Sequence, residues 1–334
     1  MSKVLSVCVP SYNMEKYLNR CIDSFLVLEV LNQLEIIIVN DGSTDGTLSI
    51  ANEYKTKYPQ SIVVIDKPNG HYGSCVNASL KVATGKYFRI VDADDWVDSD
   101  ALVVFVKTLE NIDVDCVCSK YTVHNFQENK LKTIGIDLPS NEILDLNSLS
   151  ISDKCIQMHN LTYSLRLLHA INYYQTEGVC YTDTEYVYIP LSRSKNMMFI
   201  DVSLYQYFYG RDDQSMNRSV MEKNFMHFIK VNKRLLSEHE RRDVPFNINE
   251  SFIWSKIVYG LVFHSTPPYV LHGEYDEMAE NTLRKSIQFL DQIGICSTRP
   301  IFLNRFHGIP YVILWYNYKW LSKIVLFFFK SIKT

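Results

Sequence analysis

The chain has 334 residues, of which 47% are hydrophobic and 21% are charged, so wholesale disorder is excluded and one large domain or two ordinary ones are allowed. Lys and Arg number 34 against 37 Asp and Glu, and the net charge of −3 argues against a dedicated nucleic-acid binder. The residues after Met1 pass directly into the apolar run 4–9, which is too short for the core of a signal peptide. We therefore expect a cytoplasmic protein whose 8 cysteines are reduced core residues, because they form no C-x-x-C pair.

Strand-like and helical patterns alternate over the first 120 residues. Buried strands are expected at 3–9, 34–40, 61–66, 87–92 and 114–119. Helices are expected at 14–28 with Asn13 as the N-cap, at 47–58, at 74–83 and at 99–110. This alternation is typical of an α/β fold with a mostly parallel sheet and helices on both faces. Ligands of such sheets bind at the carboxyl ends of the strands.

The regular alternation stops after residue 120. We interpret 121–215 as the second half of the same domain and 216–334 as a helical carboxyl-terminal region, with amphipathic helices at 219–240 and 276–293. The last segment, 309–334, mixes Trp, Tyr and Lys with Leu, Ile and Phe, and it is too interrupted to span a bilayer. Such a composition suits a helix that lies in the membrane interface. A helix packed on the core or on a partner subunit is the alternative.

Three carboxylates, Asp92, Asp94 and Asp95, stand at the end of the expected fourth strand. Because they repel one another, a fold tolerates them most readily when a cation compensates. Asp92 and Asp94 point to one side in extended backbone, and two hard oxygen donors with open positions suit Mg²⁺ or Mn²⁺ bridging the phosphates of a ligand. The alternative is a solvated turn in which Asp98 and Asp100 cap the next helix.

Three other loops offer polar groups at the same edge of the expected sheet. Asp41 opens D-G-S-T-D-G-T, where a carboxylate can accept hydrogen bonds from a base imide or a ribose hydroxyl, although turn chemistry explains it as well. Pro10 and Tyr12 follow the first strand. Tyr12 either stacks on a base or is a loop residue without a role in binding. Gly70 lies in a loop that enters a helix, where backbone can approach phosphate. The missing glycine cluster after the first strand counts against a dinucleotide dehydrogenase.

Together these motifs resemble the inverting glycosyltransferase family 2, which has the GT-A fold. The matches stand in family order: V-P-S-Y-N at 9–13, I-V-N-D-G-S-T-D-G-T at 38–47, P-N-G at 68–70 with G-S-C-V-N-A-S-L at 73–80, A-T-G-K-Y at 83–87, and V-D-A-D-D-W at 91–96. The resemblance implies transfer of a sugar from a nucleotide-diphosphate donor, usually a UDP-sugar, to a hydroxyl of a glycan or lipid-linked acceptor. Such enzymes build capsule and other cell-surface polysaccharides. Together with the segment 309–334, this implies a peripheral protein at the inner face of the membrane.

The resemblance also implies roles for individual residues. The first 120 residues would bind the nucleotide sugar, and 121–215 would bind the acceptor and supply the base. The donor would be held by Pro10, Tyr12, Asp41, Gly70, Asn77, Asp92 and Arg211. The metal, Mn²⁺ or Mg²⁺, would be held by Asp92, Asp94 and Asp95.

The catalytic base is expected in V-C-Y-T-D-T-E-Y at 179–186, which matches the family's later Glu-Asp motif in part because Thr182 replaces Glu. One carboxylate must deprotonate the acceptor hydroxyl. Asp183 is the preferred candidate and Glu185 the second, while Asp183 also reads as an ordinary carboxylate at a helix start. Arg211 either contacts the diphosphate or pairs with a neighbouring aspartate.

Two other functions remain as alternatives. A non-catalytic partner subunit with a degenerate transferase fold is disfavoured by the intact Asp41, Asp92, Asp94 and Asp183. A sugar nucleotidyltransferase would need a Gly-rich basic loop after the first strand, where this chain has V-P-S-Y-N.

Overall fold

The computed structural model describes residues 2–146 and 156–210, scattered positions between 220 and 238, and the short segments 305–306 and 309–310. Its contacts divide the chain into one unit of Met1–Gln214 with Ser237–Asn249 and a second of Ser215–Leu236 with Glu250–Thr334. All elements discussed below for the site belong to the first unit.

In the second unit the described elements are the antiparallel pair β11 (Arg305–Phe306) and β12 (Ile309–Pro310). Ile309 and Pro310 therefore begin the predicted interface segment as strand and not as helix. Its remainder, the helix predicted at 276–293 and most of the one predicted at 219–240 lie outside the described residues. In the part of the chain that is described, no helix has the length and apolar character to cross a membrane.

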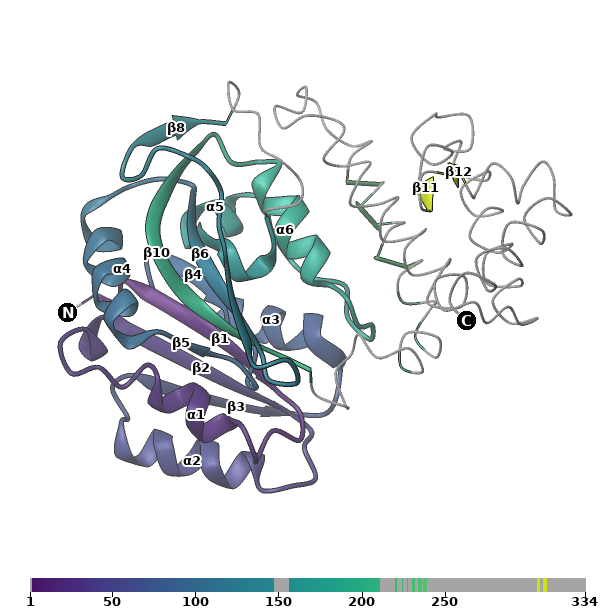
Figure 1. Ribbon diagram of the computed structural model, residues 1–334. Coiled ribbons are helices and arrows are strands. Elements are labelled where there is room, and N and C mark those ends of the chain that lie inside the picture. The colour runs from purple at the N-terminus through teal and green to yellow at the C-terminus, as the bar shows by residue number, and fades with distance from the viewer. Residues whose placement is uncertain are drawn as a thin grey trace, which may run out of the picture. The chain divides into compact units, whose positions relative to one another are not determined.

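A 10-stranded sheet forms the centre of the first unit, with the strand order β3-β2-β1-β4-β9-β6-β10-β5 (Figure 1). One half is parallel and consists of β3 (Ile62–Lys67), β2 (Leu34–Asp41), β1 (Leu5–Ser11) and β4 (Tyr87–Ile90). The short β9 (Leu161–Ser164) runs antiparallel between β4 and β6 (Cys116–Asn125). The long β10 (Asn196–Tyr209) then pairs parallel with β6. The strands predicted at 3–9, 34–40, 61–66 and 87–92 thus form the parallel half, and the sheet as a whole is mixed.

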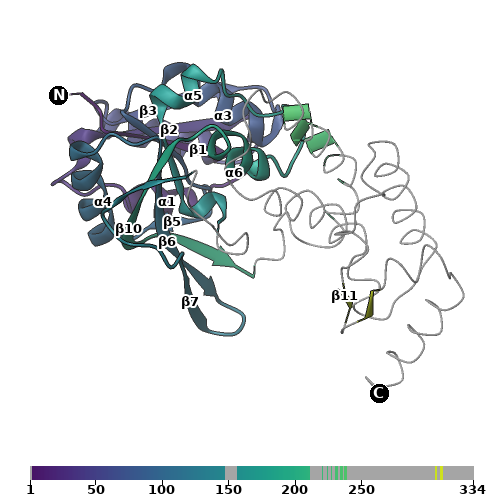
Figure 2. The same ribbon diagram turned by 90° about the horizontal axis from the view of Figure 1, so that it is seen from above.

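Three shorter strands extend this sheet in the antiparallel sense. Two of them pair with β10: β5 (Trp96–Val97) and β8 (Ile143–Asp145). The third, β7 (Lys130–Ile134), forms with β6 a hairpin that projects from the body of the unit (Figure 2). Because β5 follows the Asp92–Asp95 stretch directly, its pairing with β10 ties that stretch to a strand more than 100 residues away.

Helices cover both faces, and alternate residues of the strands separate the two layers. Val7 and Ile36 pack in one core with α1 (Leu18–Asp23), α2 (Thr47–Lys57) and α4 (Ser99–Asn111). Ile37 and Val39, one residue out of phase, pack with Cys75 of α3 (His71–Val82) on the other face. All eight residues of β2 are buried, as expected of a strand covered on both sides. The remaining helices are α5 (Leu165–Ala170) and α6 (Asp183–Leu191).

Two predicted helix starts were wrong. α1 begins at Leu18 after the N-cap Tyr17, so Asn13, which has a left-handed φ of 54°, does not cap it. Instead, the Asn13 side-chain oxygen accepts a 2.9 Å hydrogen bond from the backbone N–H of Thr44, which joins the loops after β1 and β2. α3 begins at His71, three residues earlier than predicted, directly after Gly70.

Candidate active site

The candidate site lies at the carboxyl ends of the parallel strands. The central strand β1 has β2 on one side and β4 on the other, so that Asp41 at the end of β2 and Asp92 just after β4 flank the loop that follows β1. The predicted site loops therefore share one edge of the sheet, which is where ligands of open α/β sheets bind.

Asp95 fixes the shape of the acidic turn. Its backbone N–H donates to the Asp92 carbonyl oxygen at 3.0 Å, and its side chain is fully buried. Oδ2 accepts from the Tyr205 hydroxyl at 2.5 Å and Oδ1 from the Phe208 backbone N–H at 2.7 Å. Both carboxylate oxygens thus face donors on β10, and the third aspartate of the predicted metal set anchors the turn.

Asp92 is held from two sides. Its Oδ1 accepts a 2.7 Å hydrogen bond from the Tyr72 hydroxyl of α3, and its backbone N–H donates to the Tyr205 hydroxyl oxygen at 3.2 Å. Burial, followed by the charge of Asp94, raises the pKa of Asp92 to about 7, with a further contribution from Asp183. Burial and the charges of Asp94 and Asp92 likewise raise the pKa of Asp95. The negative charges of these aspartates are therefore disfavoured by their surroundings, and a bound cation would favour the charged form of the carboxylates.

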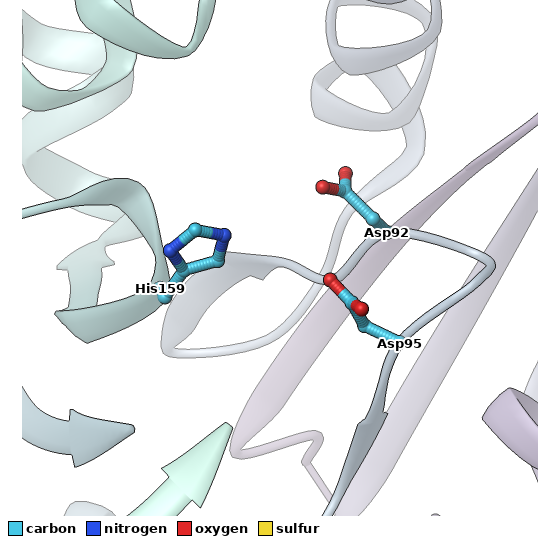
Figure 3. A group of neighbouring side chains, drawn as sticks. All are labelled: Asp92, Asp95 and His159. Carbon is cyan, nitrogen blue, oxygen red and sulfur yellow. The ribbon is translucent and has the colours of Figure 1, made fainter. Parts of the chain in front are cut away.

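His159 adds a nitrogen to this cluster. It lies in the 3-10 turn Met158–Asn160, and one ligand atom from each of Asp92, Asp95 and His159 falls within 4.8 Å of the others (Figure 3). Burial, and secondly the charge of Arg89, lowers the pKa of His159 to about 3, so the imidazole is neutral. Its Nδ1 is buried without a hydrogen-bond partner among the described residues. Asp92 and the neutral imidazole are donors that suit a divalent transition metal, whereas both oxygens of Asp95 already accept hydrogen bonds from β10.

Arg20 brings a positive charge to the same turn. Its guanidinium carbon lies 4.1 Å from the ring centroid of Trp96 and 4.8 Å from that of Phe208, and Nη2 donates to the Asp94 carbonyl oxygen at 2.5 Å. Burial lowers the pKa of Arg20, while the charges of Asp95 and Asp94 oppose that shift. The aromatic sandwich therefore holds a cation against the backbone of the acidic turn.

Asp41 is anchored by its neighbours on the next strand. Its nearly buried carboxylate forms an ion pair with Lys67, and the backbone N–H of Gly70 donates to Oδ1 at 2.9 Å. Lys67 also donates to the Ser74 hydroxyl at 2.8 Å. The carboxylate, the lysine and the start of α3 thus form one unit beside the loop after β1. In that loop Pro10 is partly buried, and Tyr12 is 49% exposed.

The two candidate bases lie in the first turn of α6 but differ in surroundings. Asp183 is partly exposed and close enough to Asp92 and Tyr72 for its charge to raise both of their pKa values. Glu185 is fully buried, and its two oxygens accept from the backbone N–H and the hydroxyl of Thr176, at 2.8 and 2.6 Å. Asp183 therefore lies close enough to the acidic turn to act on its charge, and Glu185 holds Thr176.

Two predicted donor-binding residues remain. The Asn77 amide forms hydrogen bonds to the backbone of Gln175, as donor at 2.9 Å and as acceptor at 2.8 Å, and donates to Glu177 at 2.8 Å. Arg211 lies outside the described residues. Tyr72, His159, Tyr205 and Arg20 were not among the predicted site residues. Tyr72 stands between the motifs at 68–70 and 73–80, and the other three lie outside the quoted motifs.

Comparison with known proteins agrees with this arrangement. Residues 6–169 match the family model described as Glycosyl transferase family 2. The chain is 28% identical over 249 residues to chondroitin synthase of Pasteurella multocida (strain Pm70), which covers 74% of this chain and 24% of that protein. It is 27% identical over 234 residues to hyaluronan synthase of Pasteurella multocida, which covers 70% of this chain and 23% of that protein. The chain thus spans about a quarter of the length of these two relatives.

Solved structures share the fold. The structure of S. aureus TarS 1-349 in complex with UDP-GlcNAc superposes with a TM-score of 0.60 at 20% identity, over 86% of this chain and 81% of that chain. The mannosyltransferase PcManGT from Pyrobaculum calidifontis, in complex with GDP-Man and Mn²⁺, gives a TM-score of 0.55 at 14% identity, over 90% and 82% of the two chains. These likenesses confirm the predicted GT-A fold. The match identifies residues 6–169 of this chain as a glycosyl transferase family 2 domain.

Proposed function

We propose that this protein is a metal-dependent inverting glycosyltransferase that moves a sugar from a nucleotide diphosphate, preferentially UDP, to a hydroxyl group of a glycan or lipid-linked acceptor in bacterial polysaccharide synthesis. The observation that carries the proposal is the buried acidic turn at the end of β4, with the Asp183 carboxylate of α6 facing Asp92. Relatives named for chondroitin and hyaluronan synthesis support the product class, and a fold neighbour with bound UDP-GlcNAc supports the donor class.

The nucleoside would bind beside the loop after β1. Asp41 would accept a hydrogen bond from the base imide, and the exposed ring of Tyr12, next to Pro10, would stack on the base. Gly70 places the start of α3 beside Asp41, where backbone N–H groups can approach phosphate. Arg211 stays a predicted contact of the diphosphate.

The metal would be Mn²⁺ or Mg²⁺, held by Asp94 and Asp92, with Asp95 anchoring the turn. Burial, and secondly the charges of neighbouring aspartates, raise the pKa of Asp92 and Asp95, and a bound cation would offset both effects. When bound, the ion supplies Lewis-acid stabilisation of the negative charge on the leaving diphosphate. The neutral His159 imidazole favours Mn²⁺ over Mg²⁺ if it joins the donor set.

The protein's own contribution to the reaction is the base. The Asp183 carboxylate takes the proton of the acceptor hydroxyl as its oxygen attacks the anomeric carbon. The bond between that carbon and the diphosphate oxygen breaks, and its electron pair leaves with the nucleoside diphosphate. Attack opposite the leaving group inverts the anomeric configuration, so no covalent intermediate between sugar and enzyme forms.

A panel of sugar nucleotides, assayed for nucleoside diphosphate release with Mn²⁺, with Mg²⁺ and with EDTA, tests this function. We expect UDP release from one donor, lost in EDTA, and an inverted anomeric centre in the product by NMR. Calorimetric titration of UDP with Mn²⁺ serves as the control when no acceptor is found. Absence of both UDP release and UDP binding would contradict the proposal, and pyrophosphate release from a nucleoside triphosphate and a sugar phosphate would support a nucleotidyltransferase instead.

We place the enzyme in the cytoplasm at the inner face of the membrane. The support is the composition of 309–334, in which Trp, Tyr and Lys accompany Leu, Ile and Phe. Deleting 309–334 should abolish co-sedimentation with anionic lipid vesicles and leave activity on short soluble acceptors intact. Unchanged sedimentation would contradict the placement.

A further inference from the structure

We infer that the segment 173–182, fixed between α3 and α6, sets the position of Asp183 relative to Asp92, and that Glu185 and Asn77 act on the reaction only by positioning this segment. The inference rests on the proposed function, because it assigns the base of that same site. It also decides between the two carboxylates that the sequence left open.

The first contact side is α3. The Asn77 side chain donates to the carbonyl oxygen of Gln175 and accepts from its backbone N–H, so both backbone groups of Gln175 are hydrogen-bonded by one amide. One turn earlier, Gly73 lets the segment approach so closely that an added Cβ atom would lie 2.3 Å from the Thr176 carbonyl oxygen. The Gly178 backbone N–H donates to the Gly70 carbonyl oxygen at 2.9 Å. The segment is thus docked along the first two turns of α3.

The second contact side is α6. Glu185 accepts two hydrogen bonds from Thr176, and the Thr182 hydroxyl donates at 2.9 Å to Oε1 of the fully buried Gln175. Tyr181 directly precedes Thr182, the N-cap of α6, and has a left-handed φ of 67°, which is uncommon for a non-glycine residue. The segment therefore determines where the first turn of α6, and with it Asp183, begins.

α3 connects the segment to the acidic turn. Tyr72, next to Gly73, donates to Asp92 at 2.7 Å. One helix thus holds Asp92 through Tyr72 and holds the approach to Asp183 through Gly73 and Asn77. Because the same rigid element contacts both, the separation of the two carboxylates depends on how closely the segment packs on α3.

Glu185 is excluded as the base by its own contacts. It is fully buried, and each of its carboxylate oxygens already accepts a hydrogen bond from Thr176. A glutamine keeps this shape: its carbonyl oxygen can accept from the backbone N–H, and its amide can donate to the threonine hydroxyl oxygen. A base cannot be replaced by glutamine, whereas a positioning residue can.

The test uses the full chain and four variants: Asp183→Asn, Glu185→Gln, Glu185→Ala and Gly73→Ala. Turnover is measured as UDP release with the donor that the panel identifies, and binding is measured by titration of UDP with Mn²⁺. We expect Asp183→Asn to lower kcat by about 10²–10³-fold and Glu185→Gln to stay within about threefold of wild type. Glu185→Ala and Gly73→Ala should lower kcat by about 10-fold or more with the Kd of UDP unchanged.

The outcomes separate this inference from the proposed function. If wild type neither binds UDP nor releases it from any donor, the proposed function fails before any variant is made. If wild type is active and Glu185→Gln loses as much turnover as Asp183→Asn, Glu185 is the base and the inference is wrong. Full activity of Gly73→Ala and Glu185→Ala would equally overturn it. If Glu185→Ala does not fold, Gly73→Ala and the glutamine variant still decide.

Discussion

The hydroxyl group of Tyr205 on β10 donates to Oδ2 of Asp95 at 2.5 Å and accepts from the backbone N–H of Asp92 at 3.2 Å. One phenol thus holds both ends of the acidic turn, from a strand 110 residues further along the chain. Replacing Tyr205 with Phe leaves a buried carboxylate oxygen short of a donor, which costs about 2 kcal/mol of unfolding free energy. We expect Mn²⁺-dependent turnover to fall by about 10-fold, because residues that orient a metal ligand typically contribute 10–100-fold.

Urea denaturation and a Mn²⁺ titration of UDP release measure these two effects. Tyr209→Phe is the matched control, because Tyr209 lies on the same strand but is 45% exposed. If the two variants behaved alike, the hydrogen bonds of Tyr205 would have no special role in the turn.

Asp94 should carry the largest effect of the acidic turn on turnover. Unlike Asp95, which is fully buried, Asp94 keeps 9% of its surface exposed. We expect Asp94→Ala to lower kcat at least ~10²-fold by weakening the stabilisation of the leaving diphosphate. Asp98→Ala is the control, since Asp98 follows the same stretch but caps α4 by accepting from the Ala101 backbone N–H. Asp98→Ala should lower stability by about 1 kcal/mol and leave kcat near wild type. Equal kcat losses in the two variants would contradict a metal role for Asp94.

The sequence was sufficient to place Asp41 and Asp92 at one edge of the sheet. Each follows an apolar strand, and strands alternating with helices run parallel, so their carboxyl ends meet. The sequence alone did not distinguish Asp183 from Glu185 as the candidate base. The two differ by about 200° around a helix, and only the fold reveals that Glu185 is buried against Thr176 while Asp183 is partly exposed.

Tyr205 and His159 were unpredictable for a related reason. Both reach the turn through pairing of distant segments, and β10 does so after register shifts between Ile200 and Ser203 and between Ser203 and Tyr205. A register shift changes which side chains of a strand point to which face of the sheet. The alternation of apolar and polar residues in the sequence does not reveal where such a shift occurs.

The acidic turn should make stability depend on pH in the absence of metal. The pKa of Asp92 is raised from 3.8 to about 7, so the folded chain keeps a proton that the unfolded chain has lost. The contribution of Asp92 to stability is therefore complete below about pH 4 and is lost as the pH rises through 7. Asp92→Asn removes this dependence. In EDTA, we expect the variant to gain stability relative to wild type from pH 4.5 to 7.5, by at most about 1.4 kcal/mol per pH unit.

His159 should show the opposite sign. Its pKa is lowered from 6.5 to about 3, so between these values the unfolded chain takes up a proton that the folded chain refuses. Wild type therefore loses stability as the pH falls below 6.5. The stability of His159→Gln relative to wild type should increase as the pH is lowered over this range. Denaturation curves in EDTA from pH 4.5 to 8.5 measure both variants. A constant difference between His159→Gln and wild type would show that the imidazole titrates normally.

Two lysine–carboxylate pairs offer a matched comparison of buried and exposed ion pairs. In the Lys67–Asp41 pair the side chains are 20% and 4% exposed, whereas in Lys107–Glu29 both are 55% exposed. Removing Lys67 leaves the Asp41 carboxylate nearly buried with its charge uncompensated. We expect Lys67→Met to cost about 2 kcal/mol, less than the 3–5 kcal/mol of a fully buried pair, and Lys107→Met to cost less than about 0.5 kcal/mol.

The same two variants test whether this pair serves nucleotide binding. Lys67 joins Asp41 to the start of α3 through its hydrogen bond to Ser74, so its loss should shift the Asp41 carboxylate and the Gly70 backbone together. We expect Lys67→Met to weaken UDP binding by about 10-fold in a calorimetric titration with Mn²⁺, and Lys107→Met to leave it unchanged. Unchanged UDP affinity in Lys67→Met, with the stability loss present, would restrict the pair to holding the fold and would remove Asp41 from the proposed nucleoside site.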